Sequence, residues 1–143
     1  MPPSGVFDGT RAPTERILCV DDDPALCALL ARRLAMLGYS TATATSAADA
    51  LSVLSSPGGF DAVVTDFRMP HMNGLELARA TRAICPDIVV FLLTGDADVP
   101  SDSAYGSAGI AGVFAKPPRF EELATRLGHA LSLLECAHDR RSA

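Results

Sequence analysis

Short apolar runs alternate along the chain with longer stretches whose apolar residues recur at helical spacing. We interpret four apolar runs and one alternating, Thr-rich segment as strands, at 17–20, 39–45, 62–65, 88–93 and 112–115. Helical patterns follow them at 24–37, 47–55, 75–84, 101–108 and 119–135. Runs without polar residues are typical of strands buried on both faces. The alternation predicts an α/β fold: a doubly wound, five-stranded parallel sheet in the order 2-1-3-4-5 with five helices.

A chain of 143 residues fits one domain. Proline and glycine dominate residues 1–14, which we expect to form a flexible N-terminal tail, and 137–143 is predicted to be a C-terminal tail. The domain is therefore expected at 15–136. Met1 favours a complete product over a piece of a larger hybrid kinase.

Composition narrows the function classes. The net charge is −5 and Lys116 is the only lysine, so no basic surface for direct nucleic-acid binding is predicted. The N-terminus lacks the apolar stretch of a signal peptide, and the longest apolar run, 88–93, is too short to insert into a membrane. The four cysteines lie far apart without a C-x-x-C pair, which indicates reduced thiols. A soluble, cytoplasmic protein is expected.

The first helical stretch carries a leucine stripe that we predict to face the core. It consists of Leu26, Leu29, Leu30, Leu34 and Leu37. Arg33 falls inside the stripe by angle, so its stem is expected at the edge of the core. Pro24 suits the first turn of this helix, Gly38 suits its C-terminal cap, and Ser46 is expected to cap the next helix.

Polar residues follow four of the five predicted strands. The first strand ends in the acidic run 21–23, the third in Asp66, the fourth in Thr94 and the fifth in Lys116. Sites in open α/β sheets form outside the carboxyl ends of the strands. Strands 1, 3, 4 and 5 are neighbours in the expected order, so these groups are predicted to converge in one crevice.

Carboxylates gathered in one crevice repel each other, and the pKa of at least one should rise unless a cation is present. An all-oxygen ligand set favours a hard cation such as Mg²⁺ or Mn²⁺. An ionised Asp66 could then act as a nucleophile and form an aspartyl phosphate. A cation, an ammonium group and a hydroxyl are the groups that stabilise a transferring phosphoryl group.

The segments 20–24 (VDDDP), 65–74 (TDFRMPHMNG), 93–95 (LTG) and 115–117 (AKP) resemble the receiver domain of two-component response regulators. The resemblance covers roughly residues 15–136 and implies a flavodoxin-like receiver fold. It also implies that the chain is not an enzyme but a phosphoacceptor domain that assists only its own phosphorylation and dephosphorylation.

The resemblance implies a role for each matching residue. Asp66 would be the phosphoacceptor and a metal ligand, Asp22 would bind Mg²⁺ directly, and Asp21 would act on the metal mainly through water. The backbone carbonyl of Arg68 would complete the metal ligands from the protein.

Two further residues would act on the phosphoryl group. Thr94 would hydrogen-bond to its oxygens and Lys116 would pair with them. The bond between Lys116 and Pro117 is often cis in this family. Asp23 is either a third acid of the site or a helix N-cap, and we favour the cap.

Three positions depart from the family pattern or tune it. The family often has an aromatic residue three positions before the lysine, where this chain has Val113, with Phe114 beside it. The residues that tune dephosphorylation in this family are Arg68 and Asp96 here. We hypothesise that these two attract each other across the mouth of the site and obstruct the attacking water.

The resemblance implies a phosphohistidine donor, on a histidine kinase or a histidine phosphotransfer protein. This partner would dock on the first helix and the loop after the fifth strand. The surface is predicted from Cys27, Ala28, Ala31, Pro118 and Arg119, and the alternative is that the alanines are ordinary solvent-facing residues.

No output domain follows residue 136, so output is expected through a protein contact, a homodimer formed by helix 4, strand 5 and helix 5, or phosphate transfer. The weak fourth helix is the expected mobile element. The kinase, the downstream target, the oligomeric state and the phosphoryl lifetime stay open.

Two other functions fit part of the pattern. A phosphatase of the haloacid dehalogenase type would use Asp21 and Asp23, a downstream Thr and a later Lys, but no acidic pair follows Lys116 after a further strand. A protein-binding module that is not phosphorylated would keep the fold alone.

Overall fold

The computed structural model describes residues 15–56, 59–95, 108–116 and 118–142, with side chains described as far as residue 133. The strands are β1 (Arg16–Val20), β2 (Ser40–Ala44), β3 (Ala62–Asp66), β4 (Val89–Thr94) and β5 (Ile110–Ala115). The described helices are α1 (Pro24–Met36), α2 (Ala47–Ser55), α3 (Gly74–Ile84) and α5 (Phe120–Ser142). The helix predicted at 101–108 falls, up to residue 107, outside the described residues.

The five strands form one parallel sheet in the order β2-β1-β3-β4-β5, as predicted. β1 pairs with both β2 and β3, and β4 lies between β3 and β5. The central strands β1, β3 and β4 are almost entirely buried, which explains why apolar residues dominate them up to the polar residues at the ends of β3 and β4. β2 lies at an edge, where its threonines are partly exposed.

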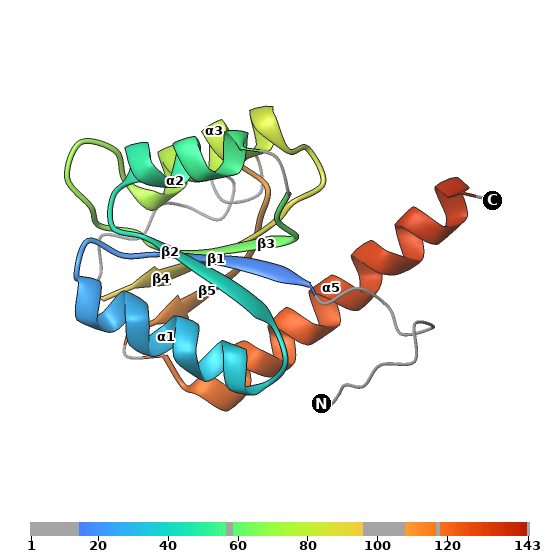
Figure 1. Cartoon of the computed structure of the whole chain (residues 1–143), viewed down its shortest axis with the longest axis horizontal. Coiled ribbons are helices and arrows are strands. Elements are labelled where there is room, and N and C mark those ends of the chain that lie inside the picture. Colours follow the sequence, from blue (N-terminus) through green and yellow to red (C-terminus); the bar gives the residue numbers. More distant parts are fainter. Residues whose placement is uncertain (1–14, 57–58, 96–107, 117, 143) are drawn as a thin grey trace.

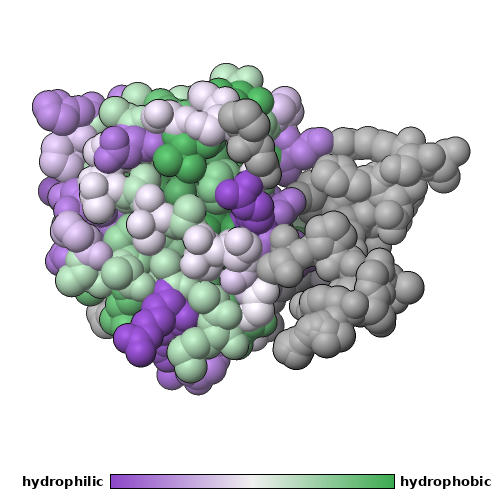
Figure 2. All heavy atoms as spheres, in the orientation of Figure 1, coloured by the Kyte–Doolittle hydropathy of each residue, from purple (hydrophilic) through white to green (hydrophobic). Residues whose placement is uncertain are grey.

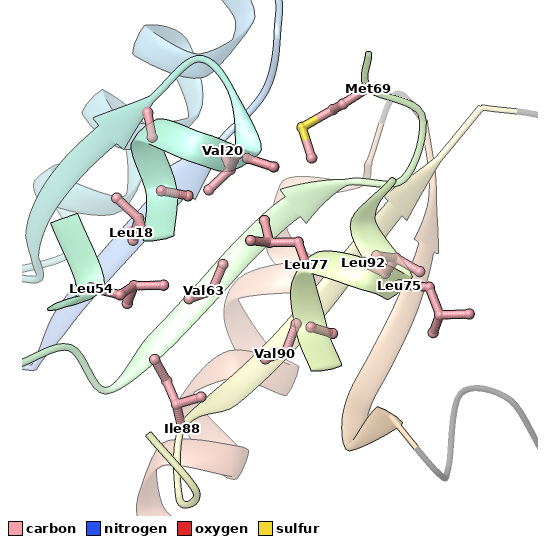
Figure 3. Close-up of a cluster of buried hydrophobic side chains, with 14 of the residues drawn as sticks. Leu18, Val20, Leu54, Val63, Met69, Leu75, Leu77, Ile88, Val90 and Leu92 are labelled. Atoms are coloured by element: carbon pink, nitrogen blue, oxygen red, sulfur yellow. The ribbon is translucent and has the colours of Figure 1, made fainter. Parts of the chain in front are cut away.

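Helices cover both faces of the sheet. Figure 1 shows α2 and α3 on one face and α1 and α5 on the other. An aliphatic cluster, including Leu18, Val63 and Leu77, fills the space beneath α2 and α3 (Figure 3). A second cluster, with Phe91, Leu34 and Leu127, lies beneath α1 and α5. Each fully buried aliphatic or aromatic side chain contributes roughly 1.5–3 kcal/mol, so the two clusters hold the strand ends in place from both sides.

Side chains cap the start of three helices. Asp23 accepts hydrogen bonds from the backbone N–H groups of Ala25 and Leu26, which confirms it as the N-cap of α1. Ser46 caps α2 by accepting from the N–H of Asp49, as predicted. Such caps satisfy backbone donors that a helix leaves unpaired.

At α3, Asn73 and Glu76 form a reciprocal capping box, with two hydrogen bonds of 2.9 Å. We had not predicted it, although Asn followed three residues later by Glu is its sequence signature. The box begins α3 directly after the loop that leaves β3.

The leucine stripe of α1 was predicted to face the core, and this is wrong for most of its members. Cys27, Ala31 and Leu34 are the buried residues of α1, whereas Leu26 and Leu29 are 45% and 52% exposed. Residues 27, 31 and 34 also recur at helical spacing. Because Cys27 and Ala31 are small, α1 can lie close to the sheet on that side, and the larger leucines turn away from it.

The last helix ends later than predicted. α5 continues to Ser142, beyond the end expected at residue 135, so the predicted tail at 137–143 is helical as far as residue 142. No glycine or proline follows Gly128, and chain breakers are what usually end a helix. The tail predicted at 1–14 lies outside the described residues. Within the part of the chain that the structure describes, no helix combines the length and apolar composition needed to cross a membrane.

Candidate functional site

The polar residues predicted to converge come from four adjacent strand ends. Asp66 and Thr94 are the last residues of β3 and β4, and Asp21 and Lys116 directly follow β1 and β5. Parallel strands end at the same edge of the sheet, and the register places Asp66 opposite Leu93, one residue before Thr94. The fold therefore collects these side chains by chain direction alone.

Three carboxylates form a cluster at this edge. One oxygen from each of Asp21, Asp22 and Asp66 lies within 4.8 Å of the others. Asp21 and Asp66 are buried and Asp22 is exposed, so the cluster opens to solvent on one side. The Lys116 Nζ atom lies 3.3 Å from Oδ2 of Asp21 and 3.3 Å from Oδ2 of Asp66, and so bridges the two buried acids.

The surroundings of Asp66 favour the protonated, neutral form of its carboxyl group. Burial raises the pKa of its carboxyl above the ordinary value, and the Asp21 charge adds to the rise. The Lys116 ammonium and the backbone N–H of Arg68 oppose the rise by stabilising the charged form. For Lys116, burial opposes the charged form, but the Asp66 and Asp21 carboxylates outweigh it and raise the pKa. One ammonium group therefore compensates the buried negative charge only in part.

The residues present fit a divalent cation. The donor set is made of carboxylate oxygens, which hard cations prefer, and its exposed side leaves room for water ligands. A bound cation would also add positive charge beside Asp66. The raised pKa of Asp66 indicates that Lys116 alone compensates the buried negative charge only in part. Asp21, Asp22 and Asp66 are the residues that would hold it. The Arg68 side chain is exposed, and its predicted contribution through the backbone carbonyl stays a prediction.

Backbone contacts hold Asp66 in position. The N–H of Phe67 donates to the carbonyl of Leu93 at 2.7 Å, and the N–H of Gly74 donates to the carbonyl of Phe67 at 2.7 Å. A Cβ atom on Gly74 would lie 2.6 Å from the carbonyl oxygen of Asp66 and 2.6 Å from Cδ1 of Leu92. Only glycine lets the start of α3 approach Asp66 so closely, which is the physical reason for Gly74 in this segment.

Val113 and Phe114 are neighbours on β5, and their side chains lie on opposite faces of the sheet. Val113 packs against the cluster beneath α2 and α3. Phe114 is buried beneath α5, with its ring 5.4 Å from that of Phe91 in an edge-to-face contact and 5.1 Å from Cζ of Arg126. No aromatic switch at position 113 is therefore available to follow Thr94.

Two residues of the sequence-based hypotheses, Asp96 and Pro117, lie outside the described residues. The attraction between Arg68 and Asp96 and the cis bond before Pro117 stay predictions. Of the four cysteines, the described thiols Cys19, Cys27 and Cys85 are free, as expected.

The predicted docking surface needs correction. Cys27 and Ala31 are buried against the sheet and cannot contact a partner, whereas Ala28 and Arg119 are exposed and Pro118 is partly buried. On α1, Leu26 and Leu29 are exposed instead. We missed these leucines because the larger apolar residues of an amphipathic helix usually face the core.

The chain matches the family model described as "Response regulator receiver domain" over residues 17–128. It is 35% identical over 125 residues to the transcriptional regulatory protein GlrR of Escherichia coli, an alignment that spans 87% of this chain and 28% of that protein. It is 38% identical over 112 residues to the response regulator MprA of Mycolicibacterium vanbaalenii, spanning 78% of this chain and 48% of that protein. The chain thus spans less than half the length of these curated relatives.

Solved structures of response regulator receiver proteins are similar to this chain. The CheY-like receiver domain protein of Methanospirillum hungatei superposes with a TM-score of 0.81 at 26% identity, covering 87% of this chain and 99% of that one. The response regulator TrrA of Thermotoga maritima, solved with Mg²⁺ and BeF, gives a TM-score of 0.72 at 32% identity, covering 82% and 99%. The sheet order, the acidic cluster at its edge and the matched residues lead to one conclusion: this chain belongs to the response regulator receiver domain family.

Proposed function

We propose that Asp66 accepts a phosphoryl group from a phosphohistidine of a histidine kinase or histidine phosphotransfer protein, in a reaction that depends on Mg²⁺ or Mn²⁺. The observation that carries this proposal is the placement of Asp66: its carboxylate lies 3.3 Å from the Lys116 ammonium and within 4.8 Å of carboxylate oxygens of Asp21 and Asp22. A nucleophile, a cationic group and a set of hard oxygen ligands are thus within reach of one phosphoryl group.

In the proposed transfer, a carboxylate oxygen of Asp66 attacks phosphorus while the phosphorus–nitrogen bond to the donor imidazole breaks. The imidazole keeps the electron pair of that bond and takes up a proton. Lys116 Nζ, now shared between two carboxylates, would turn to the phosphoryl oxygens, and Thr94, buried at the neighbouring strand end, would offer its hydroxyl. A bound Mg²⁺ would supply charge compensation in the acidic cluster.

A similar solved structure supports the choice of metal, because TrrA was solved in complex with Mg²⁺ and BeF. An unphosphorylated binding module would need none of the charged residues that meet at Asp66. Membership of the receiver family also argues against a phosphatase of the haloacid dehalogenase type.

Output is proposed to occur through a changed protein-interaction surface, formed by strand 5, the last helix and the segment between strands 4 and 5. A homodimer through these elements is one form this could take. The site would act in the cytoplasm, where kinases use ATP to form phosphohistidine. Because the curated relatives are longer than this chain, the downstream target belongs to the proposal.

The test is phosphorylation with a small donor. The full chain is incubated with acetyl phosphate and Mg²⁺, and its intact mass is measured for wild type, Asp66→Asn and the control Asp49→Asn. Asp49 is an exposed acid in the first turn of α2 and does not belong to the acidic cluster. We expect wild type and the control to gain one phosphoryl mass and Asp66→Asn to gain none. A wild-type chain that stays unmodified, or an Asp66→Asn variant that is modified equally, would overturn the proposal.

A further inference from the structure

A groove with apolar walls lies between α1 and the start of α5. Its volume of about 410 Å³ is within the range of small-molecule sites. Leu26, Leu29 and Leu30 line it from α1, and Pro118 and Phe120 line it from the α5 side. In Figure 2, hydrophobic residues are exposed on the lower part of the molecule, where Figure 1 places α1. The groove therefore offers contact surface to an aliphatic ligand.

Arg33 adds a cationic group to this apolar lining. Its guanidinium carbon lies 4.4 Å from the centre of the Phe120 ring, so the ring supports the cation on one face. Arg33 is exposed, and among the described residues no carboxylate forms an ion pair with it. A guanidinium group stacked on a ring keeps its N–H donors in its own plane, where they can bind a carboxylate in bidentate fashion.

The two ends of the groove differ in charge, and this sets the direction of an anionic ligand. Asp21 and Lys116 line the end nearest the acidic cluster, where the Lys116 ammonium already lies 3.3 Å from the carboxylates of Asp21 and Asp66. The acids there repel a further anion. Arg33 is thus the favoured partner for the head group, and an aliphatic tail would point towards Leu26.

We propose that this groove binds a free medium-chain fatty acid anion, with its carboxylate on Arg33 and its chain along Leu29 and Leu26. Leu26 and Arg33 are seven residues apart, which is two turns or about 10 Å along α1. A saturated chain of about eight to ten carbons spans this distance, given C–C bonds of about 1.5 Å. Such binding does not require phosphorylation of Asp66.

A second copy of this chain fits the groove less well. Pairing two α1 helices about a two-fold axis would bring Arg32 and Arg33 of one copy close to the same residues of the other. Like charges brought together at an interface oppose association. A fatty acid anion carries an apolar chain and a single negative charge, and so satisfies both the leucines and Arg33.

Titration calorimetry of the full chain with octanoate and with the uncharged 1-octanol, both in the presence of Mg²⁺, tests the role of the charge. We expect wild type to bind octanoate about tenfold more tightly than octanol, as for a charge-assisted hydrogen bond. Arg33→Ala should remove this preference. The matched control Arg32→Ala removes an exposed arginine of α1 that does not line the groove, and should keep the preference.

A series from hexanoate to dodecanoate tests the length of the groove. Affinity should rise by about threefold for each methylene group, somewhat less than full burial would give. The rise should level off at about ten carbons, where the groove between Arg33 and the acidic cluster is filled. Leu29→Ala should lower the affinity for octanoate by about fivefold. Met36→Ala, which removes a more exposed side chain of the same helix outside the groove, should leave it unchanged.

Lys116 provides a signal that locates the ligand, because it is the only lysine of the chain. Methylation with ¹³C keeps its charge and gives one lysine resonance, with the α-amino group giving the other. Decanoate should shift the Lys116 resonance in wild type and in Arg32→Ala, and much less in Arg33→Ala.

Three results would overturn the proposal. The first is the absence of heat with every carboxylate, as expected if the groove accepts only a polypeptide or a second copy of the chain. The second is an equal preference for octanoate over octanol in Arg33→Ala and Arg32→Ala. The third is an affinity that keeps rising beyond ten carbons without a shift of the Lys116 resonance, which would indicate detergent-like adsorption.

Discussion

The strand ends and the outer face of α1 are two regions of this domain whose side chains are arranged by different rules. At the strand ends, Asp21, Asp66 and Lys116 meet because parallel strands finish at one edge of a sheet. On α1, two stripes at helical spacing compete for the sheet, and the one with small residues packs against it. Topology thus determines the acidic cluster, whereas packing determines which face of α1 is exposed.

The difference teaches where a sequence pattern is reliable. Once the strand order is known, the position of a residue directly after a buried strand is fixed at the edge of the sheet. A leucine on a helix can face the sheet, a neighbouring helix or solvent, and the choice depends on how closely the helix can approach. Four variants or pairs of variants probe this contrast.

The largest expected effect is a difference in the free energy of unfolding between variants of two leucines of α1, Leu34 and Leu29. Leu34 is fully buried, so Leu34→Ala should lower the free energy of unfolding by about 2–5 kcal/mol, as for other large-to-small core changes. Leu29 is half exposed, and Leu29→Ala should change it by within about 0.5 kcal/mol. Urea unfolding followed by circular dichroism measures both. Equal losses would mean that both stripes pack and that the contrast between them is wrong.

The second effect separates two adjacent acids. Mg²⁺ at about 100 times its dissociation constant should stabilise the wild-type fold by about 2.7 kcal/mol. Asp22→Ala should remove this gain because it deletes one of the three carboxylates that would hold the ion. Asp23→Ala should cost about 1 kcal/mol through loss of the helix cap yet keep the full response to Mg²⁺. Thermal unfolding with and without Mg²⁺ tests this, and a lost response in Asp23→Ala would place that residue among the metal ligands.

The third effect concerns the approach of α3 to Asp66. Gly74→Ala should destabilise the fold by about 1–3 kcal/mol, because the added methyl group overlaps the Asp66 carbonyl and Leu92. It should also slow labelling by acetyl phosphate, since relief of the overlap displaces the reactive residue. Gly95→Ala is the control: its Cβ would meet open space, and a change within about 0.5 kcal/mol is expected. Equal behaviour of the two variants would argue against close packing at Asp66.

The smallest effect is a pH dependence without metal. Burial raises the pKa of folded Asp66 above its ordinary value of 3.8, so the folded state holds this proton more tightly than the unfolded state. Its contribution to stability is fully present below that value and is lost as the pH rises through the folded pKa.

Metal-free Asp66→Asn should therefore be more stable than wild type at pH 7, and the difference should vanish toward acid pH. Urea midpoints across this range measure the effect. Saturating Mg²⁺ should reverse the order at pH 7 because only wild type keeps the full ligand set. A difference that grows toward acid pH would show that the pKa is lowered instead.

Much of the fold was predictable from local signals. Apolar runs such as 62–65 identified the central strands, and the alternation with helices gave the sheet order that the structure confirms. Asp23 and Ser46 marked helix starts because their side chains accept backbone hydrogen bonds that nothing else would satisfy. The capping box of Asn73 and Glu76 had a readable signature that we did not use.

Other features depended on contacts that no local pattern carries. The stripe of α1 that packs on the sheet depends on how closely α1 approaches β1 and β2. The C-terminal end of α5 depended on the absence of glycine and proline after Gly128. This absence is a weaker signal than the apolar face of the helix, on which the predicted end was based. The role of Gly74 could be assigned only once α3 and Asp66 were seen together.

By itself, the sequence determined which chemical groups stand at the ends of the strands, because strand length and chain direction are local properties. Only the tertiary structure decided that Lys116 bridges Asp21 and Asp66 and that Leu29 faces solvent beside Arg33. The physical reason is that side-chain distances and helix faces follow from close packing between distant segments. Packing of that kind is a property of the assembled layers.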